Sequence, residues 1–65
     1  MIVINGMKKP EADGIRLSQY LSSEGYDKKT VAVECNGGII PKQDYDFKTI
    51  MDGEIIEIVS LVGGA

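Results

Sequence analysis

The sequence predicts an α+β domain in which one helix packs on one face of a small sheet. Two Asn–Gly turns between short apolar segments, one amphipathic helical stretch and a strongly β-prone segment near the end together predict this class. With 65 residues, the chain is expected to form a single domain over 1–65. A chain of this size removes only about 60% of its unfolded surface from water on folding.

The N-terminal segment predicts a β-hairpin. Apolar positions alternate over residues 2–5, as in a half-buried strand, and Asn5–Gly6 is a strong turn signal. A second strand follows over residues 7–9. It ends before Pro10, because proline has no N–H to donate to a sheet.

A helix is predicted after the chain break at Asp13–Gly14. Leu17, Tyr20 and Leu21 lie at i, i+3 and i+4, so they share one face and are expected in the core. Gly25 is placed to end the helix in a left-handed cap. The residues expected to face water are Arg16, Gln19, Ser22 and Ser23.

A second hairpin is predicted in the middle of the chain. Residues 30–35 have the alternation of a strand, and Asn36–Gly38 is the strongest turn signal in the sequence. The turn leads into a short strand at Ile39–Ile40. Pro41 closes that strand.

Residues 42–51 are expected to form a loop with one helical turn, which leads to the last strand. The expected anchors of this loop are Tyr45, Phe47 and Ile50. Asp52–Gly53 forms a tight turn, and residues 54–61 are the most β-prone segment of the chain.

The last strand predicts two different faces. If Ile56 and Ile58 point toward the helix, alternation sends Ile55, Val59 and Leu61 to the opposite face. A sheet with one helix on one side is expected to be polar on its other side, so this apolar set suggests a surface that docks another protein. The alternative is that these are the single exposed apolar side chains common in small domains.

The composition excludes several classes of function. The formal net charge is −3, histidine is absent and cysteine occurs once, so a disulfide framework, a zinc knuckle and a histidine-activated nucleophile are all excluded. We therefore expect no catalytic residue and no metal site. The acidic balance argues against nucleic acid binding. The absence of a signal peptide or membrane span predicts a cytoplasmic protein without a membrane partner.

Several individual residues have both a structural and a chemical interpretation. Cys35 is interpreted as a small core hydrophobe rather than a redox group, and Asp44 with Asp46 as a solvated surface rather than a metal site. Tyr20 is interpreted as core. For Tyr45, both a core position and a place on the docking surface remain open.

The chain ends in Gly63, Gly64 and Ala65. The simplest interpretation is a frayed end. The alternative is a flexible functional tail over 62–65, which spans about 13 Å when extended. Because glycine has no side chain, such a tail can pass through a narrow channel and present a terminal carboxylate.

Taken together, these segments resemble the ThiS family of sulfur carriers from thiamine biosynthesis over essentially the whole chain. The residues of the resemblance are Ile2-x-Ile4-Asn5-Gly6, Val33-x-Cys35-Asn36-x-x-Ile39-Ile40-Pro41-Lys42, Tyr45 and Asp52-Gly53-Glu54-x-Ile56-Glu57-Ile58-Val59-x-x-Val62-Gly63-Gly64. The resemblance implies a ubiquitin-like β-grasp fold: a mixed sheet of four to five strands with one main helix on one face.

The resemblance also implies a mechanism and partners. A ubiquitin-activating-type adenylating enzyme is expected to use ATP to adenylate the Gly64 carboxylate, which is then converted to a thiocarboxylate, with Gly63 threading the channel. The sulfur then passes to thiazole synthase or to another sulfur-accepting enzyme. The carrier is thus a protein cosubstrate with no permanently bound cofactor.

The sequence departs from the family pattern at Ala65, because members end in glycine. In one interpretation, a processing peptidase removes Ala65 and exposes Gly64; in the other, Ala65 is itself adenylated or blocks the reaction. Processed carriers of this kind also deliver sulfur to cysteine or methionine, so the final acceptor stays open. A ubiquitin-like modifier or a plain binding module is the alternative from another class.

Overall fold

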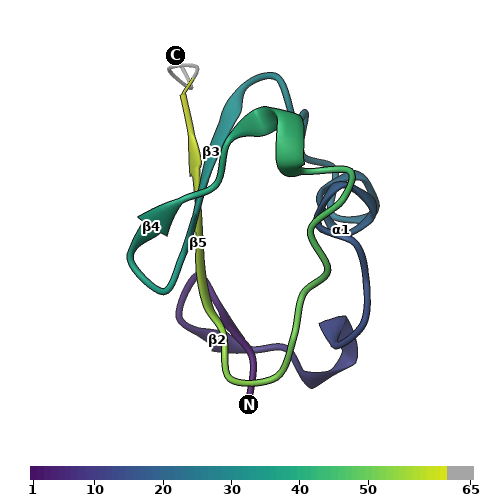
Figure 1. Ribbon diagram of the computed structural model, residues 1–65, viewed down its shortest axis with the longest axis vertical. Helices are drawn as coiled ribbons and strands as arrows, with labels where there is room; N and C mark the ends of the chain where they lie inside the picture. The colour runs from purple at the N-terminus through teal and green to yellow at the C-terminus, as the bar shows by residue number, and fades with distance from the viewer. Residues whose placement is uncertain (62–65) are drawn as a thin grey trace.

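The computed structural model describes residues 1–61 and places five strands in one mixed sheet, in the order β2-β1-β5-β3-β4. The strands are β1 (Val3–Ile4), β2 (Met7–Lys8), β3 (Val31–Cys35), β4 (Gly38–Ile39) and β5 (Ile55–Ser60). Figure 1 shows the strands on one side of the molecule and α1 (Leu17–Ser23) on the other. The predicted α+β class, with a four- to five-stranded mixed sheet and one main helix on one face, is confirmed.

The central strand, β5, connects the two halves of the sheet. It pairs in parallel with β1, placing Val3 beside Ile55, and antiparallel with β3, placing Val33 beside Ile58. Each neighbour also belongs to a hairpin, β1 with β2 and β3 with β4. The last strand of the sequence is therefore the middle strand of the sheet, and both of its edges pair with strands that are distant in sequence.

The two hairpins turn at the predicted Asn–Gly pairs. Asn5 and Asn36 both have φ of 51°, and the glycines that follow them have φ of 81° and 85°. Two successive left-handed residues form the turn that matches the twist of a hairpin. Glycine adopts this conformation without strain, and asparagine tolerates it better than most residues.

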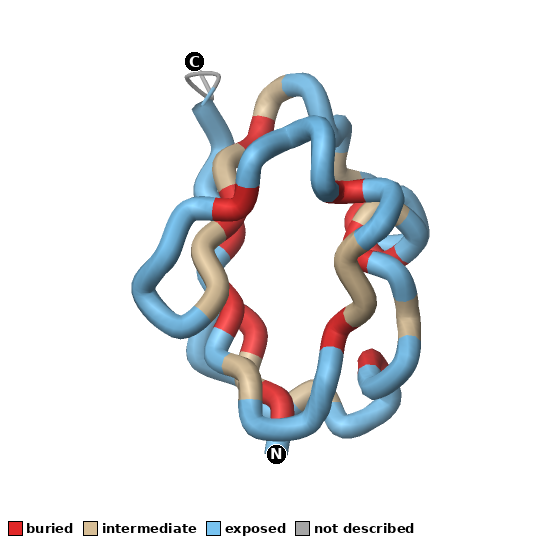
Figure 2. Tube along the Cα trace, viewed as in Figure 1, coloured by how far each residue is buried: buried red, intermediate tan, exposed pale blue. Residues whose placement is uncertain are grey.

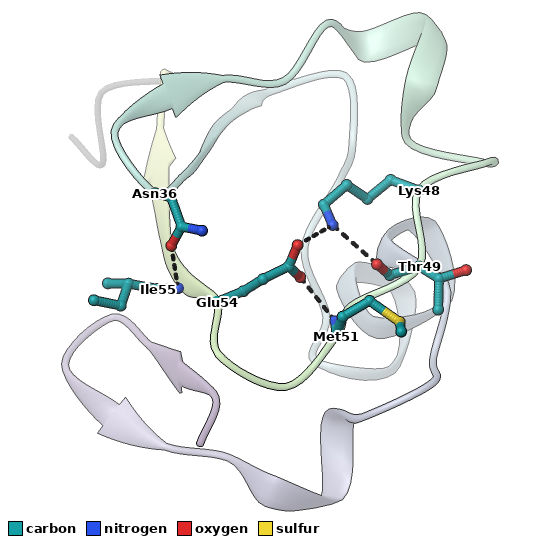
Figure 3. Close-up of polar contacts among 6 residues, drawn as sticks. All are labelled: Asn36, Lys48, Thr49, Met51, Glu54 and Ile55. Atoms are coloured by element: carbon teal, nitrogen blue, oxygen red, sulfur yellow. Dashed lines mark hydrogen bonds and ion pairs between the residues drawn. The ribbon is translucent and has the colours of Figure 1, made fainter.

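Both turn asparagines also bind β5 through their side chains. The Ile58 N–H donates to Asn5 Oδ1 at 2.7 Å, and the Ile55 N–H donates to Asn36 Oδ1 at 2.8 Å. Figure 3 shows the second of these bonds. Each asparagine thus satisfies a β5 donor close to where its own hairpin strand ends.

The short helix α1 ends as the sequence predicts. Gly25 has φ of 82°, its N–H donates to Ser22 O at 3.1 Å, and the Tyr26 N–H donates to Leu21 O at 2.9 Å. These two bonds are those of a Schellman cap. At the other end, the Leu17 and Ser18 N–H groups donate to the carbonyls of Lys48 and Tyr45 instead of to a side-chain cap.

The loop between β4 and β5 therefore packs against the start of the helix. It contains the 3-10 helix η2 (Lys42–Asp44), which matches the predicted helical turn. A second 3-10 helix, η1 (Pro10–Ala12), follows β2 and was not predicted; it buries Ala12 completely. Its first residue is proline, whose fixed φ suits a helical start.

The core fills the space between the sheet and α1, and Figure 2 shows buried segments along both sides of this interior. The core residues are Ile2, Ile4, Ala12, Leu17, Tyr20, Leu21, Val31, Val33, Ile40, Tyr45, Ile50, Ile56 and Ile58. Tyr20 is in the core, as predicted. Tyr45, which the sequence left open, is also core: it is 1% exposed and its hydroxyl donates to Val31 O at 3.4 Å.

The expected role of Phe47 as a loop anchor is wrong. Its side chain is 81% exposed, while Tyr45 and Ile50 are buried. The backbone turns helically here, with the Phe47 and Lys48 N–H groups both donating to Asp44 O. Side chains two residues apart on a helical turn point to different sides, so burial of Tyr45 turns Phe47 outward.

Candidate functional site

The two faces of β5 have the phase that the sequence predicts. Ile56 and Ile58 are 1% and 7% exposed, toward α1, whereas Ile55, Val59 and Leu61 are 55–60% exposed. We call the side of the sheet away from α1 the open face. The structure therefore brings the three residues of the predicted docking surface together on one exposed face.

Neighbouring strands extend this apolar surface. Val3 of β1 lies beside Ile55, and Ala32 of β3 lies beside Val59. Ile39 of β4, which is 72% exposed, lies one strand further out, beside Glu34. The open face is therefore broader than β5 alone and reaches across four of the five strands.

The start of β5 is fixed by a half-buried ion pair on the other side of the sheet. Lys48 Nζ donates to Glu54 Oε2 at 2.7 Å and to Thr49 O at 2.9 Å, and the Met51 N–H donates to Glu54 Oε1 at 2.8 Å (Figure 3). Burial raises the pKa of Glu54, but the hydrogen bonds from Lys48 and Met51 lower it by more. The pKa of Glu54 therefore lies below its ordinary value. Glu54 therefore stays ionised at neutral pH and holds the loop against the strand.

Cys35 lies beside this ion pair and packs against the core. Burial raises the pKa of the Cys35 thiol most, and the hydrogen bond with Glu54 raises it further. A thiol with a raised pKa is a poor nucleophile at neutral pH. Cys35 therefore packs against the core as predicted, but it is half-buried and not one of the fully buried core residues.

The remaining polar candidates lie on the surface. Asp44 and Asp46 are exposed, and Lys28 Nζ donates to Asp46 Oδ1 at 3.3 Å. Hydrogen bonds from Ser18 and from Lys28 lower the pKa of Asp46. Within residues 1–61, no three side chains among His, Cys, Asp and Glu gather closely enough to hold a metal ion.

A groove of about 520 Å³ runs beside α1. Its lining is mostly polar and consists of Ser18, Gln19, Leu21, Ser22, Tyr26, Asp27, Lys28 and Asp46. No residue of the open face contributes to it. No helix within the described part of the chain has the length and apolar character needed to cross a bilayer.

The predicted tail begins where the described residues end. Leu61 is held to the sheet because its N–H donates to Thr30 O at 2.7 Å. Gly63, Gly64 and Ala65, predicted as the threading, attachment and processed residues, lie outside residues 1–61. Their roles stay predictions, as does the partner docking predicted for Ile55, Val59 and Leu61.

Known proteins are similar to this chain in sequence and in fold. A thiazole synthase of Paramagnetospirillum magneticum is 36% identical over 63 residues, which is 97% of this chain and 19% of that protein. The chain thus spans about a fifth of the length of this curated relative.

Two solved structures of a thiamine biosynthesis protein (ThiS) from Geobacter metallireducens match with a TM-score of 0.75 and 25% sequence identity. The match covers 98% of this chain in both, with 97% of the protein in the crystal structure and 86% in the solution structure. The sequence model of the ThiS family matches residues 2–64, nearly the whole chain. The chain therefore belongs to the ThiS family, the small sulfur carriers of thiamine biosynthesis.

Proposed function

We propose that this chain carries sulfur as a thiocarboxylate on Gly64 and delivers it to a thiazole synthase. The observation that supports this most is the family match, which extends through Gly64. A carrier of this kind needs a stable scaffold, a recognisable surface and a reactive end. The absence of histidine from the chain is no obstacle, because enzymes that bind the carrier supply the catalytic groups.

The first step makes the carboxylate reactive. A Gly64 carboxylate oxygen attacks the α-phosphorus of ATP on an adenylating enzyme, which forms the acyl adenylate and releases pyrophosphate. A carboxylate is a poor electrophile, and AMP is a good leaving group. ATP is thus a substrate of the partner and is not bound permanently by the carrier.

The second step introduces the sulfur. The terminal sulfur of a persulfide attacks the acyl carbon and AMP leaves, which joins carrier and donor through an acyl disulfide. A thiol then attacks the donor sulfur of this S–S bond. The carrier leaves with the thiocarboxylate, and the donor is left in a disulfide with the attacking thiol.

The acceptor is proposed from the relative that matches this chain. A protein named thiazole synthase contains a segment 36% identical to 97% of this chain. A carrier and its acceptor act in succession, so their presence in one polypeptide supports a thiazole synthase as the acceptor here. Delivery toward cysteine or methionine has no comparable observation in its favour.

Two further parts of the proposal concern surfaces and processing. The open face, through Ile55, Val59 and Leu61, docks the adenylating enzyme. A peptidase cleaves the Gly64–Ala65 bond and exposes the carboxylate that is adenylated. The cleavage is needed because the added methyl group of Ala65 clashes in a channel shaped for glycine.

Intact mass measurement tests the proposal. The form ending at Gly64 and the form ending at Ala65 are each incubated with the organism's own adenylating enzyme, ATP and a persulfide donor. We expect the Gly64 form alone to gain the mass of one oxygen replaced by sulfur. Conversion of the Ala65 form without loss of its last residue would rule out processing, and conjugates to lysine would favour the modifier function.

A further inference from the structure

Two glutamates lie side by side in the middle of the open face. Glu34 of β3 and Glu57 of β5 are directly paired in the antiparallel register, so their Cβ atoms lie about 5 Å apart on the same face. Glu57 is exposed and Glu34 is half-buried. Like charges directly opposite each other in a sheet are destabilising, so the pair gives the isolated domain no stability.

Apolar side chains lie beside this pair on three strands. Ile55 and Val59 flank Glu57 on β5, Ala32 precedes Glu34 on β3, and Ile39 lies on the far side of Glu34. The carboxylates are thus an acidic centre on a surface that is mainly apolar. A partner that covers the apolar residues also removes water from the two carboxylates.

No cation within the described residues 1–61 neutralises this pair. The three ion pairs there join Met1 to Asp52, Lys28 to Asp46 and Lys48 to Glu54. Lys8 shares the open face, but it lies on β2, two strands away from Glu57. Covering the pair with an apolar surface alone would bury two unpaired charges, which is strongly unfavourable.

We propose that the adenylating enzyme docks on the open face and inserts an arginine side chain between Glu34 and Glu57. A guanidinium has five N–H donors in a planar fork, so one arginine can bond two adjacent carboxylates, whereas an ammonium is a compact point charge. Its aliphatic stem packs against Ile55 and Val59. The inference rests on the proposed function for the partner's identity and adds the chemistry by which that partner is recognised.

Isosteric neutralisation tests the pair. Binding of the full chain to the organism's own adenylating enzyme is measured by surface plasmon resonance for Glu34→Gln, Glu57→Gln and the double variant. The matched control is Glu24→Gln, which removes the same charge from an exposed position after α1. We expect the double variant to bind about 10- to 100-fold more weakly, mainly through faster dissociation, and the control to change less than about twofold.

Thermal unfolding checks that the effect is not structural. The double variant is expected to melt at the same temperature as the wild type or higher, because a repulsion is removed. A lower melting temperature would show that the pair supports the fold and would overturn the inference. The inference would also be overturned if the loss of affinity came only from slower association and Glu24→Gln showed the same loss. That result would indicate long-range electrostatic attraction only.

The remaining outcomes separate this inference from the function on which it rests. If wild type and double variant bind the adenylating enzyme equally and both acquire sulfur, the arginine contact is wrong and the carrier function stands. If the double variant loses affinity only for thiazole synthase or for a second copy of the chain, the proposed occupant is wrong. If the wild-type form ending at Gly64 neither binds nor is converted, the proposed function itself fails.

Discussion

The two faces of β5 hold nearly the same side chains in opposite surroundings. Ile56 and Ile58 are buried beneath α1, whereas Ile55 and Val59, on the same strand, are more than half exposed. Residue type therefore does not decide which side is core. Register does, because a shift of one residue would exchange the two sets. In the isolated domain one face maintains the fold, and the other is available for a partner.

The largest expected effect is on the buried face. Ile56→Ala removes methyl groups from a side chain that is 1% exposed, so it should lower the free energy of unfolding by about 2–5 kcal/mol. Ile55→Ala, its neighbour on the open face, should lower it by less than about 1 kcal/mol. Urea denaturation measures both, and equal losses would contradict the two-face description.

The next effect separates docking from folding. Val59→Asp places a carboxylate within the apolar open face, so binding to the adenylating enzyme should weaken about 10- to 100-fold while the fold persists. The control is Phe47→Asp, since Phe47 is 81% exposed but lies off the sheet. Calorimetric titration gives the affinities, and circular dichroism verifies folding. If both variants bind as the wild type does, the open face is not the docking surface.

A smaller effect is expected at the ion pair that fixes the start of β5. Glu54→Gln removes the charged partner of the half-buried Lys48, so it should lower the free energy of unfolding by about 1–3 kcal/mol at pH 7. Because the pKa of Glu54 in the fold lies below its ordinary value of 4.5, this stabilisation is complete above that pH. It is lost as the pH falls through the lower, folded value.

The comparison for this pair is Asp46→Asn. That substitution breaks an ion pair whose side chains are both more than half exposed, and it should leave the stability unchanged at neutral pH. Melting temperatures measured from pH 7 to pH 3 test both variants. As the pH falls, the melting temperature of Glu54→Gln should decrease less steeply than that of the wild type. Parallel decreases would contradict the lowered pKa of Glu54.

The smallest effect is on thiol reactivity. Cys35 faces the core side of β3 and its pKa is raised, so iodoacetamide should alkylate it slowly at pH 7. A chain carrying Cys35→Ala and Ile39→Cys places the only thiol on the open face, where position 39 is 72% exposed. Mass spectrometry should show faster labelling of that chain, and equal rates would indicate that the core side is accessible.

Local signals in the sequence predict most of this fold. The two Asn–Gly turns, the Gly25 cap and the alternation in β5 each depend on neighbouring residues, and each forms as expected. Phe47 was misplaced because its orientation depends on a helical turn whose extent the sequence does not define. The 3-10 helix at Pro10–Ala12 was missed for a similar reason, since three residues give no periodicity to detect.

Features that depend on long-range pairing were less accessible. The apolar residues of the docking surface follow from alternation within one strand. The Glu34–Glu57 pair requires the register between β3 and β5, which are separated by a hairpin strand and a long loop. The nearest signal in the sequence was a glutamate at an outward position of each predicted strand, which suggests a shared face but not adjacency.

The side-chain hydrogen bonds of the two hairpin asparagines also affect how fast these residues deamidate. An asparagine followed by glycine is the pair most prone to deamidation, because the following N–H attacks the side-chain carbonyl with little steric hindrance. Asn5 and Asn36 are both of this type, but their side-chain oxygens each hold a β5 N–H. Folding therefore protects both asparagines from deamidation. Conversion to aspartate would keep the acceptor oxygen, whereas conversion to isoaspartate would lengthen the backbone of the turn and break the hydrogen bond to β5.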